Sequence, residues 1–289
     1  MRSTHRIAIP LLALAAAALL APTSIIAAEG HFDKTLSVNG AVTLNVSTGS
    51  GYIHITPGAD NQIHIQGHVK SSNNWMGGGS NQSAEQRVND VVSNPPIDQT
   101  GSIIRVGKDH GLNHVSIDYD ITAPKNTTLS AGSGSGDIRI SDVGQNAKLS
   151  TGSGNIDATG LMGTISLETG SGDITASQNS AGDVKAGTGS GNIHLNNIQG
   201  GLKAETGSGN IEISGKPTSA WKLGTGSGDV TLAVNGAAFD LDASTGSGGI
   251  ETVPITVQGN LDKHHVMGKV NGGGPAVRVE TGSGSVHIH

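Results

Sequence analysis

Short runs of alternating apolar and polar residues fill most of this chain, and a glycine-rich hexapeptide interrupts them at regular intervals. Its most regular copies read Thr-Gly-Ser-Gly-(Asp or Asn)-Ile, and a variant that begins at Ser133 brings the number of copies to nine. Counted from Ser133, successive copies begin 18, 18, 19, 18, 19, 20 and 36 residues apart. Because the last step is twice 18, we expect one repeat there that has lost its hexapeptide. The other eight copies begin at Thr48, Thr151, Thr169, Thr188, Thr206, Thr225, Thr245 and Thr281.

The alternation predicts a strand on each side of every hexapeptide. After the Asp or Asn, apolar residues take the first and third places, as Ile193 and Leu195 do. Before the Thr, they take the fourth and second places, as Leu202 and Ala204 do. A period of two residues is typical of a strand with one buried face. Each repeat, or rung, is therefore expected to be a strand, a glycine-rich turn, a second strand and a looser second turn.

A single rung is too small to fold alone. Its roughly four buried side chains contribute about 1.5–3 kcal/mol each, whereas ordering its backbone costs about 1–2 kcal/mol per residue. Stacked rungs share one apolar interior and gain hydrogen bonds above and below, and equal spacing keeps equivalent residues in register. We therefore predict an all-β fold, a parallel β-solenoid or β-helix built from rungs of about 18 residues. Its handedness and the choice between two and three sides stay open.

The hexapeptide supplies turn residues rather than catalytic ones. Its paired glycines suit a tight corner with positive φ, and its hydroxyl, Asn and Asp side chains suit ladders along one edge. Nine copies of a Gly-Ser-Gly turn differ from the single Gly-x-Ser-x-Gly of a nucleophile elbow. The turn residues that we single out are Thr151, Gly152, Gly154, Thr169, Gly170, Gly172, Thr188, Gly189, Gly191, Thr206, Gly207 and Gly209.

One segment departs from the repeat, because 85 residues separate the first copy of the hexapeptide from the second. Within it, residues 83–92 have a helical pattern, with Ser83 as N-cap and Gln86 as its capping-box partner. Two prolines at 95 and 96 end the helix. We expect an insertion over about residues 70–112 that lies against or caps the solenoid, within a single domain of residues 29–289. The expected buried face of the helix carries Ala84, Val88, Val91 and Val92.

The first 28 residues have the three parts of a secretory signal peptide. Arg2 and Arg6 form a basic start, residues 7–20 are apolar with one interruption at Pro10, and small residues lead to Ala28. We predict cleavage after Ala28 or one residue earlier, and therefore export to the periplasm, the extracellular space or the cell surface. A retained anchor is the alternative, although a spanning helix needs about 20 apolar residues. No second long apolar segment follows, so we expect no membrane span in the mature chain.

Composition narrows the classes of function. A net charge of −6 and only six aromatic residues argue against nucleic acid as a partner. The chain has no cysteine, which excludes disulfides and thiolate metal sites. Three Asp among the nine corner positions are too few for a calcium site at each turn. Outward histidines such as His54, His64, His194 and His287 lack a fixed metal-binding spacing. We therefore predict no metal and no cofactor.

Outward positions of the strand before the hexapeptide form a column that contains four lysines. One interpretation is a row that contacts an anionic polysaccharide, and the other is solvated charge that discourages sheet-to-sheet aggregation. A second surface feature lies at the end of the chain, where residues 286–289 look like a strand with an open edge. That edge keeps self-association among the expected properties. The lysines of the column are Lys148, Lys185, Lys203 and Lys222.

Four features together resemble a known group. They are the repeated hexapeptide, the early strand pair Ile53-His54-Ile55 and Ile63-His64-Ile65, the short helix before Pro95-Pro96, and the strand over residues 115–121 that leads into Ala123-Pro124. It is the bacterial putative-adhesin family of β-strand-repeat proteins, a domain of unknown function, and the head domain of putative autotransporter adhesins is similar. The resemblance covers about residues 30–289 and implies a β-helical envelope or surface protein without catalytic residues.

The sequence thus predicts a non-enzymatic exported β-solenoid, an adhesin or an envelope-associated binding or structural protein. Its expected partners are envelope glycans or another surface protein. The alternative, from a different class, is a carbohydrate-active β-helix enzyme, such as a polysaccharide lyase or hydrolase. Such enzymes use aromatic platforms for sugars, and this chain has few aromatic residues.

Overall fold

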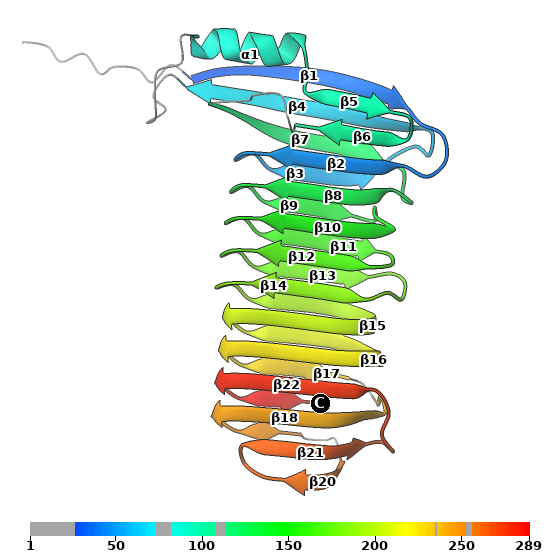
Figure 1. Cartoon of the computed structure of the whole chain (residues 1–289), viewed down its shortest axis with the longest axis vertical. Helices are drawn as coiled ribbons and strands as arrows, with labels where there is room; N and C mark the ends of the chain where they lie inside the picture. Colours follow the sequence, from blue (N-terminus) through cyan, green and yellow to red (C-terminus); the bar gives the residue numbers. More distant parts are fainter. Residues whose placement is uncertain (1–26, 73–81, 108–113, 235, 253–255) are drawn as a thin grey trace, which may run out of the picture.

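The computed structural model describes residues 27–72, 82–107, 114–234, 236–252 and 256–289. The molecule is a long, narrow stack of strands with a short helix at one end (Figure 1). Residues 1–26 of the predicted signal peptide lie outside the described part, whereas Ala27 and Ala28 begin the first strand. The predicted all-β solenoid is confirmed, because the rungs pair in parallel and in register along most of the stack.

Two sheets face each other across one interior, which settles the number of sides. The front sheet contains the strands that precede the hexapeptides, and the back sheet contains those that follow them. Two strands, β15 (Ile193–Ser208) and β16 (Ile211–Ser227), continue through the second turn and belong to both sheets. In spatial order, the other front strands are β5 (Ile97–Thr100), β6 (Ile103–Val106), β2 (Thr43–Thr48), β8 (Thr128–Ser133), β10 (Asn146–Thr151), β12 (Ile165–Thr169), β14 (Val184–Thr188), and, beyond β15 and β16, β22 (Ala276–Ser283), β18 (Phe239–Ser247), β21 (His265–Val270) and β20 (Val257–Leu261).

The back sheet follows the same rung order. Its strands are β1 (Ala27–Ser37), β4 (Gln62–Ser72), β7 (Val115–Ala123), β3 (Ile53–Pro57), β9 (Ile138–Ser141), β11 (Ile156–Leu161), β13 (Ile174–Gln178), and, beyond β15 and β16, β17 (Val230–Ala233), β23 (Val286–Ile288) and β19 (Ile250–Glu251).

The interior is a ladder of aliphatic side chains, as the alternation predicts. Leu149 and Leu167 are register partners in the front sheet, and Ile156 and Ile174 are partners in the back sheet. All four are at most 1% exposed. Because each inward residue lies between equivalents from the rungs on either side, the interior is continuous and close-packed along the stack.

The order of rungs at the C-terminal end differs from the order in the sequence. The last rung, formed by β22 and β23, lies between the rung of β16 and β17 and the rung of β18 and β19. The expectation of an extra rung in the 36-residue step is therefore wrong. The chain there instead forms an antiparallel hairpin of β20 and β21, whose β21 pairs with β18. The expected open edge at residues 286–289 is wrong as well, because β23 has a strand on each side.

The N-terminal end is built in the same way (Figure 1). The first rung, β2 and β3, lies between the rung of β6 and β7 and the rung of β8 and β9. Beyond them, β4 pairs antiparallel with β7, and β1 pairs antiparallel with β4. At each end, the chain therefore leaves one position in the stack open and reverses direction through antiparallel strands. A parallel rung then fills the open position.

The helix α1 (Ala84–Ser93) covers the N-terminal end. Ser83 is its N-cap, and both hydrogen bonds of the predicted capping box with Gln86 are present. The helix packs on β1 at Gly30, where a Cβ atom would overlap the side chains of Val88 and Val92. Ala84, Val88 and Val91 are buried, as the helical pattern predicts.

Tyr119 is the one large side chain of the interior whose polar atom stands without a partner among the described residues. It is 0% exposed, and burial raises the pKa of its phenol well above the usual value. A buried hydroxyl without a hydrogen bond costs about 1–3 kcal/mol. We expect Tyr119→Phe to leave the midpoint of urea unfolding unchanged or to raise it. A clearly lower midpoint would mean that the hydroxyl has a partner.

Candidate functional site

The Thr or Ser hydroxyl that begins each hexapeptide joins its turn to the neighbouring rung. Thr188 Oγ1 donates to the carbonyl oxygen of Gly172 in the neighbouring rung at 2.9 Å, and it accepts from the backbone N–H of Gly191 at 3.1 Å. The donated bond recurs in all nine copies at 2.7–2.9 Å, and it links the rungs in their spatial order. The donors are Thr48, Ser133, Thr151, Thr169, Thr188, Thr206, Thr225, Thr281 and Thr245.

We expect Thr188→Val to lower the free energy of unfolding by about 1–3 kcal/mol, because it leaves two buried backbone groups unpaired. Thr188→Ser is the matched control. It keeps the hydroxyl and removes one methyl group, a loss of about 0.8 kcal/mol. Denaturant unfolding followed by circular dichroism compares the two variants, and equal losses would show that the hydroxyl ladder contributes nothing.

The hexapeptide glycines are needed for a reason other than the one that the sequence indicates. None of them has positive φ, so the expected left-handed corner is wrong. A Cβ atom on Gly152 would overlap the carbonyl oxygen of Gly134 in the neighbouring turn, and one on Gly154 would overlap that of Gly136. The same overlap occurs at Gly170, Gly172, Gly189, Gly191, Gly207 and Gly209. The turns stack so closely that no side chain fits between them, and the second turns carry the positive φ instead, as at Gly144, Gly163 and Gly200.

The Asp and Asn of the hexapeptides form a second ladder. Asp173 Oδ1 accepts from the backbone N–H of Asn192 at 2.7 Å, and Asn192 Oδ1 accepts from that of Asn210 at 2.9 Å. Each side chain thereby accepts a backbone hydrogen bond from the next turn. In the described part of the chain, no three His, Asp or Glu side chains converge as a metal site would require.

The four predicted lysines point outward from the front sheet, in one row across its strands. Lys185, Lys203 and Lys222 are consecutive partners in register, and Lys148 is separated from Lys185 by Ser166. The neighbouring row carries acids that neutralise most of them. Lys185 donates to Glu168 and holds the pKa of that carboxyl below its usual value.

Glu205 forms ion pairs with the next two lysines of the row. It lies 2.8 Å from Lys203 and 3.2 Å from Lys222, and these ammonium groups lower the pKa of its carboxyl. Farther along the row, Arg278 contacts Glu280 at 2.7 Å and Asp242 at 3.8 Å. Most of the row is therefore a strip of exposed ion pairs rather than a positive surface.

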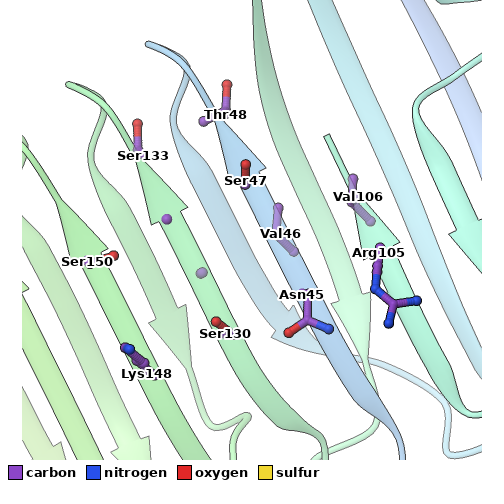
Figure 2. Close-up of a pocket in the computed structure, with 12 residues that line it drawn as sticks. Asn45, Val46, Ser47, Thr48, Arg105, Val106, Ser130, Ser133, Lys148 and Ser150 are labelled. Atoms are coloured by element: carbon purple, nitrogen blue, oxygen red, sulfur yellow. The ribbon is translucent and has the colours of Figure 1, made fainter. Parts of the chain in front are cut away.

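At the N-terminal end of this row the front sheet is hollowed. The hollow, which we call the trough, has a volume of about 520 Å³ and lies over β6, β2, β8 and β10. Arg105 and Lys148 stand at its two sides, and Asn45 and Ser130 lie between them (Figure 2). Its floor in the neighbouring row has only small groups, namely Ser47, Gly132 and Ser150.

Sequence reasoning finds Lys148 and misses the rest of the trough. Arg105 is visibly outward, because Ile104 and Val106 on either side of it are apolar. Its register with Asn45 depends on the insertion, which separates them in the chain and places β6 beside β2. The spacing of the hexapeptides carries no information about that pairing.

The outward histidines pair with carboxylates of adjacent strands on the back sheet, which the sequence analysis did not predict. His54 lies 3.1 Å from Asp120, and His194 lies 3.1 Å from Glu212. Similar pairs join His64 to Asp33 at 2.7 Å and His287 to Glu251 at 3.2 Å. His64 and Asp33 are diagonal neighbours, and the other three pairs lie in register across neighbouring strands. All four pairs are partly solvated, so each is worth at most about 1 kcal/mol.

Comparison with known proteins gives a family and several solved structures of low sequence identity. None of the curated proteins matches the chain. Three solved structures cover 90% of it: a "putative adhesin" from Bacteroides fragilis (13% identity, 97% of that chain, TM-score 0.46), a "putative cell adhesion protein" from Clostridium sporogenes (14%, 99%, 0.28) and a "putative adhesin" from Parabacteroides distasonis (12%, 97%, 0.39). The model of the Toastrack DUF4097 family matches residues 37–289. The resemblance seen in the sequence is thus confirmed, and the chain belongs to the Toastrack DUF4097 family.

Proposed function

We propose that this chain is a non-enzymatic, exported binding protein of the bacterial envelope, which contacts envelope glycans through the outward face of its front sheet. The observation that carries the proposal is the trough, a polar hollow beside a strip of exposed ion pairs. Hydroxyl, amide and cationic groups line it, and these are the groups that bind sugar hydroxyls and their acidic substituents.

The pattern of the first residues and the regular spacing of the outward rows support this function. The first 28 residues have the composition of a signal peptide. Among the described residues, no helix has both the length and the apolar character that crossing a membrane requires. The rigid stack holds the outward rows at the spacing of the strands, about 4.8 Å apart, which presents a regular surface to an extended polymer.

A glycan array and an envelope pull-down with the purified full-length chain test the proposal. We expect binding to a subset of envelope polysaccharides without release of new reducing ends or unsaturated sugars. Turnover of a bound polysaccharide would show that the chain is an enzyme instead. Binding to no glycan and to no envelope fraction would overturn the proposal.

A further inference from the structure

The trough differs from the rest of the front face in how its cations are compensated. Along the rest of the face, the row beside the cations carries an acid on alternate strands, namely Glu168, Glu205 and Glu280, with Gly187 and Gly224 between them. In the trough, the equivalent positions are Ser47, Gly132 and Ser150. Three consecutive strands therefore lack an acid in this row at the place where the surface is also hollow.

Arg105 and Lys148 keep their charges available. Among the described residues, neither has a carboxylate within ion-pair distance, and neither side chain makes a hydrogen bond, although both are exposed. Among the described residues, two acids stand at the margins of the trough. Asp98 is the partner of Arg105 in register across β5 and β6, and Glu168, which pairs with Lys185, lies beyond Ser150.

The geometry suits an extended ligand rather than a single ion. Arg105 and Lys148 are separated by the strands β2 and β8, a span of about 14 Å at the usual strand spacing. Between them, Asn45 and Ser130 present an amide and a hydroxyl in the same row. An arginine binds a carboxylate, sulfate or phosphate with two parallel hydrogen bonds, and a lysine binds such groups as a point charge.

We propose that the trough binds an acidic polysaccharide, with Arg105 and Lys148 on two anionic substituents and Asn45 and Ser130 on the sugar hydroxyls between them. This inference rests on the proposed function and names its ligand class. The strip of ion pairs over Lys185, Lys203 and Lys222 is not part of the site, because its acids repel the same polymer.

Isothermal titration of the purified full-length chain tests the inference with three acidic probes and one neutral one. Polygalacturonate carries carboxylates, a heparin fragment carries sulfates, a polyglycerol phosphate carries phosphodiesters, and dextran is neutral. We expect binding to at least one acidic probe, and the strongest of the three identifies the anionic group. Inorganic sulfate and phosphate at the same anion concentration are expected to bind at least tenfold more weakly than the polymer.

Variants locate the binding. The double variant R105Q/K148Q should bind the acidic probe at least tenfold more weakly. The matched control R139Q/K216Q removes one arginine and one lysine from exposed positions outside the trough and should change affinity less than twofold. Asp98→Asn should strengthen binding about twofold or more, since it removes the negative charge opposite Arg105. Circular dichroism confirms that each surface variant is folded.

The outcomes separate this inference from the proposed function. Equal losses in R105Q/K148Q and R139Q/K216Q, or a loss of the same size in K203Q/K222Q, would show attraction by overall charge and would overturn the inference. Binding of a neutral glycan that is insensitive to R105Q/K148Q would also overturn it while leaving the proposed function intact. Binding to no acidic probe would overturn it as well.

Discussion

Gly191→Ala is expected to lower the free energy of unfolding by about 2–4 kcal/mol, because the closely stacked turns leave no space for the new methyl group. A Cβ atom at this position would overlap the backbone carbonyl of Gly172 in the neighbouring turn. The obstacle is backbone rather than the end of a flexible side chain, so the two rungs must move apart locally. That movement weakens the hydroxyl bond of Thr188 to Gly172 and the ladder bonds beside it.

Gly187→Ala provides a matched control four residues away. Gly187 lies in β14 on the outward side, and a Cβ atom there would come no closer than 3.9 Å to another residue. Alanine also restricts the unfolded chain more than glycine does, so the variant should be neutral or more stable by up to about 1 kcal/mol. Guanidinium unfolding of the two variants gives the comparison. Equal midpoints would contradict the close stacking of the turns.

Trp221→Ala is expected to lower the free energy of unfolding by about 3–5 kcal/mol. Trp221 is 1% exposed, and its partners in register are Leu202 on one side and Val277 on the other. Its Nε1 donates to the carbonyl oxygen of Gly200 at 2.8 Å. Truncation therefore opens a cavity between two rungs and leaves that carbonyl without this partner.

Two variants serve as controls for Trp221→Ala. Trp221→Phe keeps most of the ring volume and should lose less stability than the alanine variant. Lys222→Ala changes the adjacent outward residue, whose exposed ion pair with Glu205 is worth at most about 1 kcal/mol. If urea unfolding gave Trp221→Ala and Lys222→Ala similar midpoints, Trp221 would not lie in a packed interior.

The sequence predicts the elements of this fold well because each depends on local pattern. Alternation identifies inward residues such as Leu149 and Ile156, and both are buried. The capping box at Ser83 and Gln86 places the helix start correctly. Both signals come from residues close together in the chain, where periodicity and backbone hydrogen bonding determine the outcome.

The order of the rungs is not predictable in this way. The hexapeptide rungs have nearly equivalent edges, so parallel pairing in register is satisfied whether β22 follows β18 or lies before it. The order is decided at the ends, where antiparallel strands such as β21 and β4 close the stack. The role of the hexapeptide glycines cannot be predicted from local sequence either. The backbone carbonyl oxygen that excludes a side chain at each of them belongs to another rung.

The trough is predictable only in part. Lys148 belongs to the regular column, whereas Arg105 enters the site through the pairing of β6 with β2. The column also overstates the positive charge of the face, because the acids that compensate Lys185 and Lys203 lie one row away. Alternation shows which residues point outward, and the register between strands decides which of them meet.

Cross-linking of paired cysteines tests the stacked rungs and their order most directly, because the natural chain has no cysteine. Lys222 and Arg278 are partners in register, as are Arg278 and Asp242, whereas Lys222 and Asp242 are two strands apart. Disulfides need Cα atoms about 4.4–6.8 Å apart, and adjacent strands lie about 4.8 Å apart. We predict rapid oxidation of the pairs Lys222→Cys with Arg278→Cys and Arg278→Cys with Asp242→Cys, and none for Lys222→Cys with Asp242→Cys. Oxidation of that last pair alone would contradict the inserted final rung, and oxidation of none of the three would contradict the stack itself.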